Sequence, residues 1–150
     1  MTTVLVLNGP NLGRLGSREP DVYGGGTLDD LDAALTGAAS GITVSDMTID
    51  LRQTDDEATL IGWLHEAVDN GNPVILNPAA FTHYSYALRD AAALVTKAGL
   101  ILVEVHISNP HARESFRHTS VISAVATGVI AGFGFDSYLL GLDLVARRLG

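Results

Sequence analysis

Residues 4–23 read VLVLNGPNLGRLGSREPDVY, so four apolar residues are followed by sixteen residues of turn formers with two arginines and one tyrosine. The continuous apolar run at 4–7 is typical of a strand that is covered on both faces of a sheet. A connection from such a strand to a helix needs only about 2 to 6 residues. The long segment after it is therefore either a functional lid or a disordered loop, and the rest of the sequence has to decide.

Short β-branched runs alternate with amphipathic runs along the whole chain. Strands are expected at 4–7, 42–49, 73–76, 100–107 and within 123–133, and helices at 27–40, 58–71, 86–99 and 137–149. Strands that alternate with helices form a parallel sheet covered on both faces and joined by right-handed crossovers. We expect a flavodoxin-like, doubly wound α/β fold of five strands in the order 2-1-3-4-5, built as one domain over residues 1–150.

Capping residues support the expected helix ends. Thr27 and Asp30 approximate a capping box, and TDDE at 54–57 has the S/T-x-x-E pattern of a true one. Asn70–Gly71 and Gly99 carry the stop signals of the second and third helices.

Composition excludes several classes of protein. The chain has 150 residues, 47% of them hydrophobic, a mean hydropathy of +0.25 and a net charge of −8. This acidic balance argues against a nucleic-acid partner, and the absence of cysteine excludes disulfides and thiolate chemistry. The N-terminus lacks the pattern of a secretory signal and no apolar run is long enough for a membrane span, so we expect a cytoplasmic protein. The high apolar fraction suggests that some surface is buried between subunits.

Polar residues collect after three of the expected strands. Segments 8–11, 77–83 and 104–113 follow the first, third and fourth strands, which are neighbours in the order 2-1-3-4-5. Ligands of such sheets bind outside the carboxyl ends of the strands, where the strand order reverses. These three segments are therefore expected to converge on one site.

Four of the nine basic residues lie in the segments after the first and fourth strands: Arg14, Arg18, Arg113 and Arg117. Arg113 and Arg117 would share one face if their segment were helical. Guanidinium groups that gather in an acidic protein favour an anionic small molecule. The alternative is that they are surface arginines paired with Glu19 and Glu114.

Two pairs of residues are candidates for proton transfer. Glu104 and His106 are two apart on a strand and so face the same way, which suits a carboxylate that orients an imidazole acid. Tyr23 is the one tyrosine of the long loop, and Arg18 nearby would favour its phenolate form and make it a base. The plainer alternatives are a buried ion pair and a tyrosine that only packs the loop in place.

Several known motifs are absent. The chain has no G-x-G-x-x-G after a strand, no P-loop and no G-x-S-x-G elbow, and its histidines lack the spacing of a metal site. The triplet Gly24–Gly26 is interpreted as the hinge of a lid that spans residues 13–26.

Three segments together resemble a known family. NGPNLGRLGSREPDVYG (8–24), NPAAFTHYSYALRDA (77–91) and EVHISNPHARESFR (104–117) are similar to the motifs of the type II 3-dehydroquinate dehydratases of the shikimate pathway. The resemblance covers nearly the whole chain, including ATGVIAGFG (126–134) and the final helix. It implies anti elimination of water from 3-dehydroquinate through an enolate, giving 3-dehydroshikimate, in the cytoplasm and without cofactor or metal.

The resemblance also implies roles for individual residues. Tyr23 would be the base that removes the C2 proton, with Arg18 favouring its phenolate, and Asn11 would stabilise the enolate through a water. His106 would protonate the departing C1 hydroxyl, with Glu104 orienting it.

Other residues would serve the substrate and the assembly. The positions that would hold substrate are Asn77, His83, Ile107, Ser108 and Arg117. Arg113 would be a partner of the lid, and Asp90 would reach the site of a neighbouring subunit in a homododecamer built from trimers.

The sequence has two alternative interpretations. A type I dehydratase would need a Schiff-base lysine in a (β/α)₈ barrel, but the chain is too short for that barrel and its single lysine, Lys97, stands near the end of a helix. A catalytically inactive flavodoxin-like module for binding or assembly remains the alternative to an enzyme.

Overall fold

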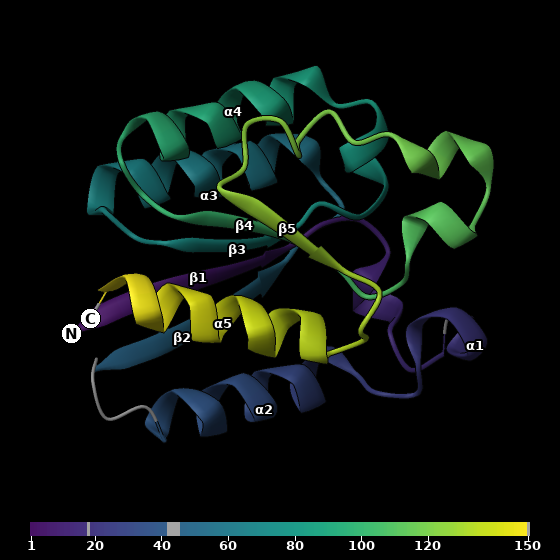
Figure 1. Ribbon diagram of the computed structural model, residues 1–150, viewed down its shortest axis with the longest axis horizontal. Helices are drawn as coiled ribbons and strands as arrows, with labels where there is room; N and C mark the ends of the chain where they lie inside the picture. The colour runs from purple at the N-terminus through teal and green to yellow at the C-terminus, as the bar shows by residue number, and fades with distance from the viewer. Residues whose placement is uncertain (18, 42–45, 150) are drawn as a thin grey trace.

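The computed structural model describes residues 1–17, 19–41 and 46–149, and the described chain forms one five-stranded parallel sheet in the order β2-β1-β3-β4-β5 (Figure 1). The strands are β1 (Thr2–Asn8), β2 (Met47–Gln53), β3 (Val74–Asn77), β4 (Leu102–His106) and β5 (Gly128–Ala131). The predicted α/β class and strand order are confirmed.

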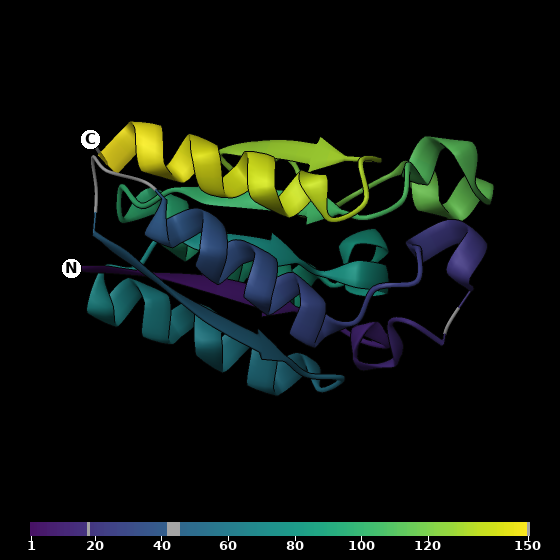
Figure 2. The ribbon, with the colours of Figure 1, turned by 90° about the horizontal axis from the view of Figure 1, so that it is seen from below.

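Two pairs of helices cover the two faces of the sheet. Figures 1 and 2 show α2 (Leu28–Ser40) and α5 (Asp136–Leu149) on one face, with α3 (Glu57–Asn70) and α4 (Tyr86–Lys97) on the other. Val4 and Val6 pack toward α2 and α5, whereas Leu5 and Leu7 pack toward α3 and α4. This double burial explains why β1 is a continuous apolar run instead of an alternating one. No helix in the described ranges has the length and apolar character needed to cross a membrane.

Short helical segments gather beyond the carboxyl ends of the strands. They are η1 (Leu12–Arg14), α1 (Pro20–Tyr23), η2 (Ala79–His83), η3 (Pro110–Ala112) and η4 (Ser115–His118). In the long loop after β1, Leu12, Leu15 and Tyr23 are buried in the same core as α2 and α5. The described residues of this loop are therefore anchored by apolar packing.

The second strand differs from its predicted range of 42–49. Residues 42–45 lie outside the described residues, and β2 runs from Met47 to Gln53, paired with the whole of β1 from Thr2↔Met47 to Asn8↔Gln53. The apolar–polar alternation continues beyond Ile49 through Asp50, Leu51 and Arg52, so the predicted range ends too early. On this edge strand the guanidinium of Arg52 binds Asp50 at 2.8 Å and Glu66 of α3 at 2.6 Å, so both polar side chains fit the strand.

The capping predictions had two outcomes. The Thr27–Asp30 box is confirmed, since Thr27 Oγ1 accepts from the Asp30 amide at 3.2 Å and Asp30 Oδ2 accepts from the Thr27 amide at 3.0 Å. The predicted box at 54–57 is wrong because Asp56 caps α3, accepting from the Ala58 amide at 3.3 Å. Thr54 instead extends the sheet, where its amide donates to the Asn8 carbonyl at 3.0 Å.

Three polar side chains are buried where β1 and β3 end. Tyr138 of α5 is fully buried; its hydroxyl donates to Asn8 Oδ1 at 2.7 Å and accepts from Asn77 Nδ2 at 2.7 Å. Burial raises the pKa of the Tyr138 phenol above its usual range, which keeps the hydroxyl neutral. Because a neutral hydroxyl both donates and accepts, this one atom joins the ends of two strands to a helix.

Replacing Tyr138 by phenylalanine tests the importance of this junction. Tyr138→Phe leaves one amide donor and one amide acceptor buried without their partner, which we expect to lower the free energy of unfolding by about 1 to 3 kcal/mol. Denaturant unfolding at fixed protein concentration measures the change. The matched control is Tyr86→Phe, an exposed tyrosine whose replacement should cost less than about 0.5 kcal/mol; equal effects of the two variants would contradict the account.

Candidate active site

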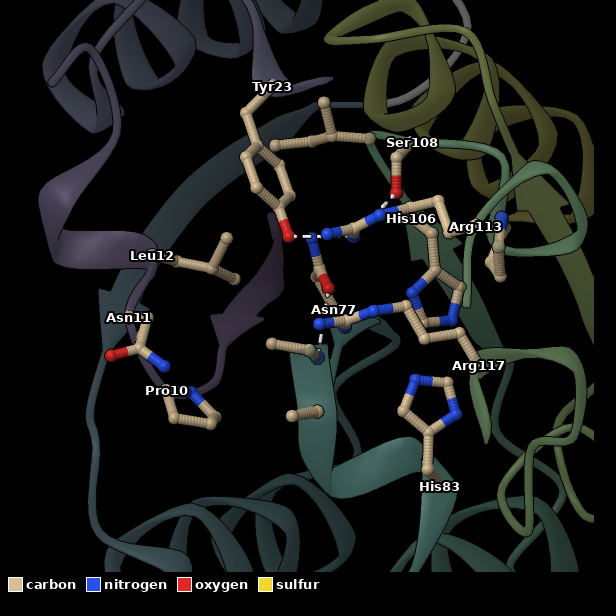
Figure 3. A pocket seen from close by; sticks show the side chains of 14 residues that line it. Pro10, Asn11, Leu12, Tyr23, Asn77, His83, His106, Ser108, Arg113 and Arg117 are labelled. Carbon is tan, nitrogen blue, oxygen red and sulfur yellow. Dashed lines mark hydrogen bonds between the residues drawn. The ribbon is translucent and has the colours of Figure 1, made fainter. Parts of the chain in front are cut away.

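A pocket opens beyond the carboxyl ends of β1, β3 and β4, at the position expected for a doubly wound sheet (Figure 3). Nine of the residues singled out in the sequence line it: Asn11, Tyr23, Asn77, His83, His106, Ile107, Ser108, Arg113 and Arg117. The three segments expected to converge therefore do so.

Tyr23 reaches the pocket from α1, at the far end of the long loop. Its hydroxyl accepts a hydrogen bond from Arg113 Nη1 at 2.8 Å, and the same nitrogen lies 3.3 Å from Ser108 Oγ. The Arg113 guanidinium also lies over the tyrosine ring, 5.2 Å from its centroid. Arg113 thus joins the loop after β1 to the loop after β4. Arg18, predicted beside this hydroxyl, is outside the residues that the structure describes.

His106 and Glu104 lie on the same face of β4, as their spacing predicts. His106 Nε2 is 2.5 Å from Glu104 Oε2, and the carboxylate is fully buried. Burial raises the pKa of the Glu104 carboxyl, but the bonds from His106, Ser123 and Thr82 outweigh it and hold the pKa below its usual value. The geometry therefore favours an ionised Glu104 that orients the imidazole by Nε2 and leaves Nδ1 for a bound molecule.

Asn77 and His83 are tied to the protein on the β3 side of the pocket. The Asn77 amide bonds Tyr138 and also accepts from the Ala79 amide at 3.0 Å, while His83 Nδ1 lies 2.8 Å from the Thr119 carbonyl. These bonds fix both side chains before any ligand arrives, which is what a preorganised binding site needs.

The two arginines after β4 do not share a helix face. Two short 3-10 segments, η3 and η4, replace the helix that the spacing would need, and Arg113 lies between them. Both arginines nevertheless line the pocket, with Arg117 paired to Glu114 at 3.2 Å. Both arginines reach the pocket while η3 packs beside η4, with the His111 and His118 rings 5.9 Å apart, and not because of helical periodicity.

Arg14 and Asp90 lie outside the pocket, whereas Asn11 lines it. Arg14 is exposed on η1 and does not line the pocket. Asp90 is exposed on α4 beside Arg89, at 3.5 Å, and is outside the pocket of its own chain. Asn11 has a left-handed backbone conformation, φ 69°, and its backbone N–H donates to Asp55 Oδ1 at 2.8 Å.

Sequence reasoning missed the polar residues behind His106. Thr82 Oγ1 lies 2.7 Å from Glu104 Oε2, and Ser123 Oγ lies 2.6 Å from Oε1. Ser120 is also within bonding distance, at 3.1 Å. The sequence does contain one signal for such residues: Glu104 lies within the apolar run of a buried strand, and a buried carboxylate needs several hydrogen-bond donors. In the described ranges, no group of three histidine, aspartate or glutamate side chains is arranged to hold a metal ion.

Comparison with known proteins gives a consistent result. Residues 2–146, which include every residue lining the pocket, match the family model described as dehydroquinase class II. The 3-dehydroquinate dehydratase of Salinispora tropica is 58% identical over 147 residues, 97% of each chain. The crystal structure of type II dehydroquinase from Propionibacterium acnes has a TM-score of 0.91 at 48% identity, covering 98% of this chain and 97% of that one. A type II dehydroquinase from Butyrivibrio crossotus has a TM-score of 0.89 at 37% identity, covering 96% and 97%.

The ionised state of Glu104 gives a prediction for stability. Because the folded protein lowers the pKa of Glu104, its stabilising contribution is complete above the ordinary glutamate value, about 4.3, and is lost as the pH falls through the lower folded value. Glu104→Gln should therefore lower the free energy of unfolding by about 2 kcal/mol at pH 7. Denaturant titrations at a series of pH values should show the two proteins converging in acid, whereas a gap that stays constant down to pH 3 would contradict an ionised Glu104.

Proposed function

The chain belongs to the dehydroquinase class II family, and from this premise we propose how it works as a 3-dehydroquinate dehydratase, a carbon–oxygen lyase. We propose that Tyr23 removes the C2 proton of 3-dehydroquinate and that His106 protonates the departing C1 hydroxyl. The observation that carries the proposal is that Tyr23 and His106, from separate segments, line the same pocket beside two arginines (Figure 3), and that the His106 imidazole is bound to the Glu104 carboxylate.

Proton abstraction begins at Tyr23. As a phenolate, its Oη accepts the C2 proton, and the C2–H electrons form an enolate with the C3 carbonyl oxygen. The charged donor of Arg113, 2.8 Å from Oη, stabilises the phenolate relative to the phenol. We keep Arg18 as a second cation for the same oxygen and Asn11 as the group that stabilises the enolate through a water.

Elimination ends at His106. The enolate collapses to a C1=C2 double bond conjugated with the ketone, the C1–O bond breaks, and the hydroxyl leaves as water with a proton from His106 Nδ1. Because Nε2 is bound to Glu104, Nδ1 is the ring nitrogen that can donate to the substrate. We propose that base and acid act on opposite faces of the ring, as an anti elimination requires. These proton transfers need no cofactor.

The remaining lining residues suit an anionic, hydroxylated ring. Arg117 supplies a guanidinium for the substrate carboxylate, and Asn77 and His83 supply polar groups for hydroxyls. Ile107 and Ser108, directly after β4, supply backbone and hydroxyl groups on the same side.

Further proposals concern the whole enzyme. We propose that residues 1–150 form one catalytic domain whose segment 13–26 acts as a lid, consistent with the Arg113 bond that holds Tyr23. Exposed Asp90 is proposed to reach the pocket of a neighbouring subunit in a homododecamer. We place the enzyme in the cytoplasm and in the shikimate pathway, which the name of its relatives implies.

Removing the proposed base tests the mechanism. Tyr23→Phe keeps the ring and its packing but deletes the oxygen that accepts the proton, so kcat should fall about 10²- to 10⁴-fold. Turnover is measured by the ultraviolet absorbance of the conjugated enone product. Tyr86→Phe is the control with an exposed ring and should keep normal kcat; near-normal kcat in a folded Tyr23→Phe protein would refute Tyr23 as the base.

Borohydride distinguishes this mechanism from imine chemistry. The chain has a single lysine, Lys97, which is exposed at the end of α4 and does not line the pocket. Treatment with borohydride in the presence of 3-dehydroquinate should leave turnover intact once the reagent is removed. Loss of activity with reduced substrate attached to Lys97 would contradict the proposal.

A further inference from the structure

The carboxylate of Glu104 has more hydrogen-bond donors than the proposed mechanism uses. Besides His106, it is surrounded by the hydroxyls of Thr82, Ser120 and Ser123, which we call the hydroxyl cage. Thr82 belongs to η2, while Ser120 and Ser123 lie between η4 and β5. Two segments remote from β4 in the sequence are therefore folded around one buried charge.

Counting the hydrogens in the hydroxyl cage shows which group donates each hydrogen bond. Ser120 Oγ accepts from the amides of Ile122 and Ser123, each at 3.1 Å, and has one hydrogen of its own to give. Its shortest oxygen contact is with Thr82 Oγ1, at 2.5 Å, and Thr82 in turn lies 2.7 Å from Glu104 Oε2. The geometry favours a chain in which two amides donate to Ser120, Ser120 to Thr82, and Thr82 to Glu104.

The other carboxylate oxygen has its own donor. Ser123 Oγ is 2.6 Å from Glu104 Oε1, so each oxygen receives a hydroxyl, and Oε2 also receives His106 Nε2. Chains of hydrogen bonds polarise one another in a medium of low dielectric, which strengthens their hold on the terminal anion. The lowered pKa of the Glu104 carboxyl, in spite of the burial that raises it, agrees with this arrangement.

The consequence concerns the proton that His106 has to release. If His106 were the sole partner of Glu104, loss of the imidazolium would leave a buried carboxylate with one neutral donor, an unfavourable state. The pair would then hold its proton tightly, and the proton could move to Glu104 instead of to a substrate. With the cage present, Glu104 is stabilised as an anion whether His106 is charged or neutral.

We propose that Thr82, Ser120 and Ser123 are positioning residues that let His106 give up its proton, by keeping Glu104 ionised after the transfer. The inference rests on the proposed role of His106 as the general acid. None of the three hydroxyls is assigned a contact with substrate; they act through Glu104.

Other titratable and charged groups around His106 have to be kept constant in a test. Tyr23 comes from α1 and His83 from η2. The others follow β4 and are His111 in η3, Arg113, and Arg117 and His118 in η4. Substitutions in the cage change none of these groups, so a shift of the His106 titration in the variants reports on the cage.

The first measurement is the titration of His106 itself. Exchange of the imidazole Cε1 hydrogen for deuterium depends on ring protonation, and peptide mass spectrometry follows it for each histidine over a series of pH values. Thr82→Val removes a cage hydroxyl with little change of shape, and Thr82→Ser keeps it. We expect the titration midpoint of His106 to move up by about 0.5 to 1 pH unit in Thr82→Val and Ser123→Ala, but not in Thr82→Ser.

The second measurement is the pH dependence of kcat for the same proteins. One limb of the pH profile of kcat should coincide with the titration of His106 in the unsubstituted enzyme. In Thr82→Val and Ser123→Ala we expect this limb to move to higher pH and kcat to fall about fivefold or more. Ser40→Ala, which removes an exposed hydroxyl at the end of α2, should change neither quantity. Ser123→Ala keeps the test possible if Thr82→Val fails to fold.

The outcomes separate the cage from the mechanism on which it rests. An unmoved His106 midpoint in both hydroxyl-deleted variants overturns the proposal, even if kcat or stability falls. A midpoint that moves while the kinetic limb stays in place shows that the cage controls His106 but that His106 is not the acid, so the proposed mechanism fails. Movement of both, with Thr82→Ser unchanged, supports both.

Discussion

The functional end of this fold depends on a single buried charge. Glu104 lies on β4 inside the sheet, where an ionised carboxylate without partners would be prohibitively unfavourable. Its donors come from three places in the sequence: His106 on the same strand, Thr82 in η2, and Ser123 before β5, while Ser120 supports Thr82. Satisfying this charge fixes the imidazole and also brings together the segments that border the pocket. The same hydrogen bonds to Glu104 thus orient the proposed acid and hold the surrounding loops in place.

The neighbouring strand ends are held by a different kind of chemistry. Tyr138 bridges Asn8 and Asn77 through neutral hydrogen bonds at 2.7 Å, with a phenol that burial keeps protonated. The pocket therefore lies between a neutral hydrogen-bonded junction at β1 and β3 and an ionised carboxylate, bound to an imidazole, at β4. Tyr23 is placed differently again, by packing of its ring and by the guanidinium of Arg113 on its hydroxyl.

The sequence predicts the fold well because its strongest patterns are local. The run at 4–7 and the cap at Thr27 need only neighbouring residues to be interpreted, and both predictions hold. The cap of α3 differs from the prediction because the Thr54 amide donates to the Asn8 carbonyl, 46 residues away in the sequence, and Asp56 caps the helix. The same limit applies at the site: Glu104 and His106 share a visible spacing, whereas no spacing links them to Ser120 and Ser123. The bond between Arg113 and Tyr23 likewise joins residues 90 apart in the sequence, and no local pattern shows it.

The central claim is that base and acid act on opposite faces of the substrate ring. The most direct test uses 3-dehydroquinate carrying deuterium at C2 only on the face opposite the C1 hydroxyl. Mass spectrometry of the 3-dehydroshikimate formed shows which hydrogen has left. The account predicts a product without deuterium, because the phenolate of Tyr23 removes it while His106 protonates the hydroxyl from the other side. A product that retains the deuterium would mean syn elimination and would contradict the assignment of the two residues to opposite faces.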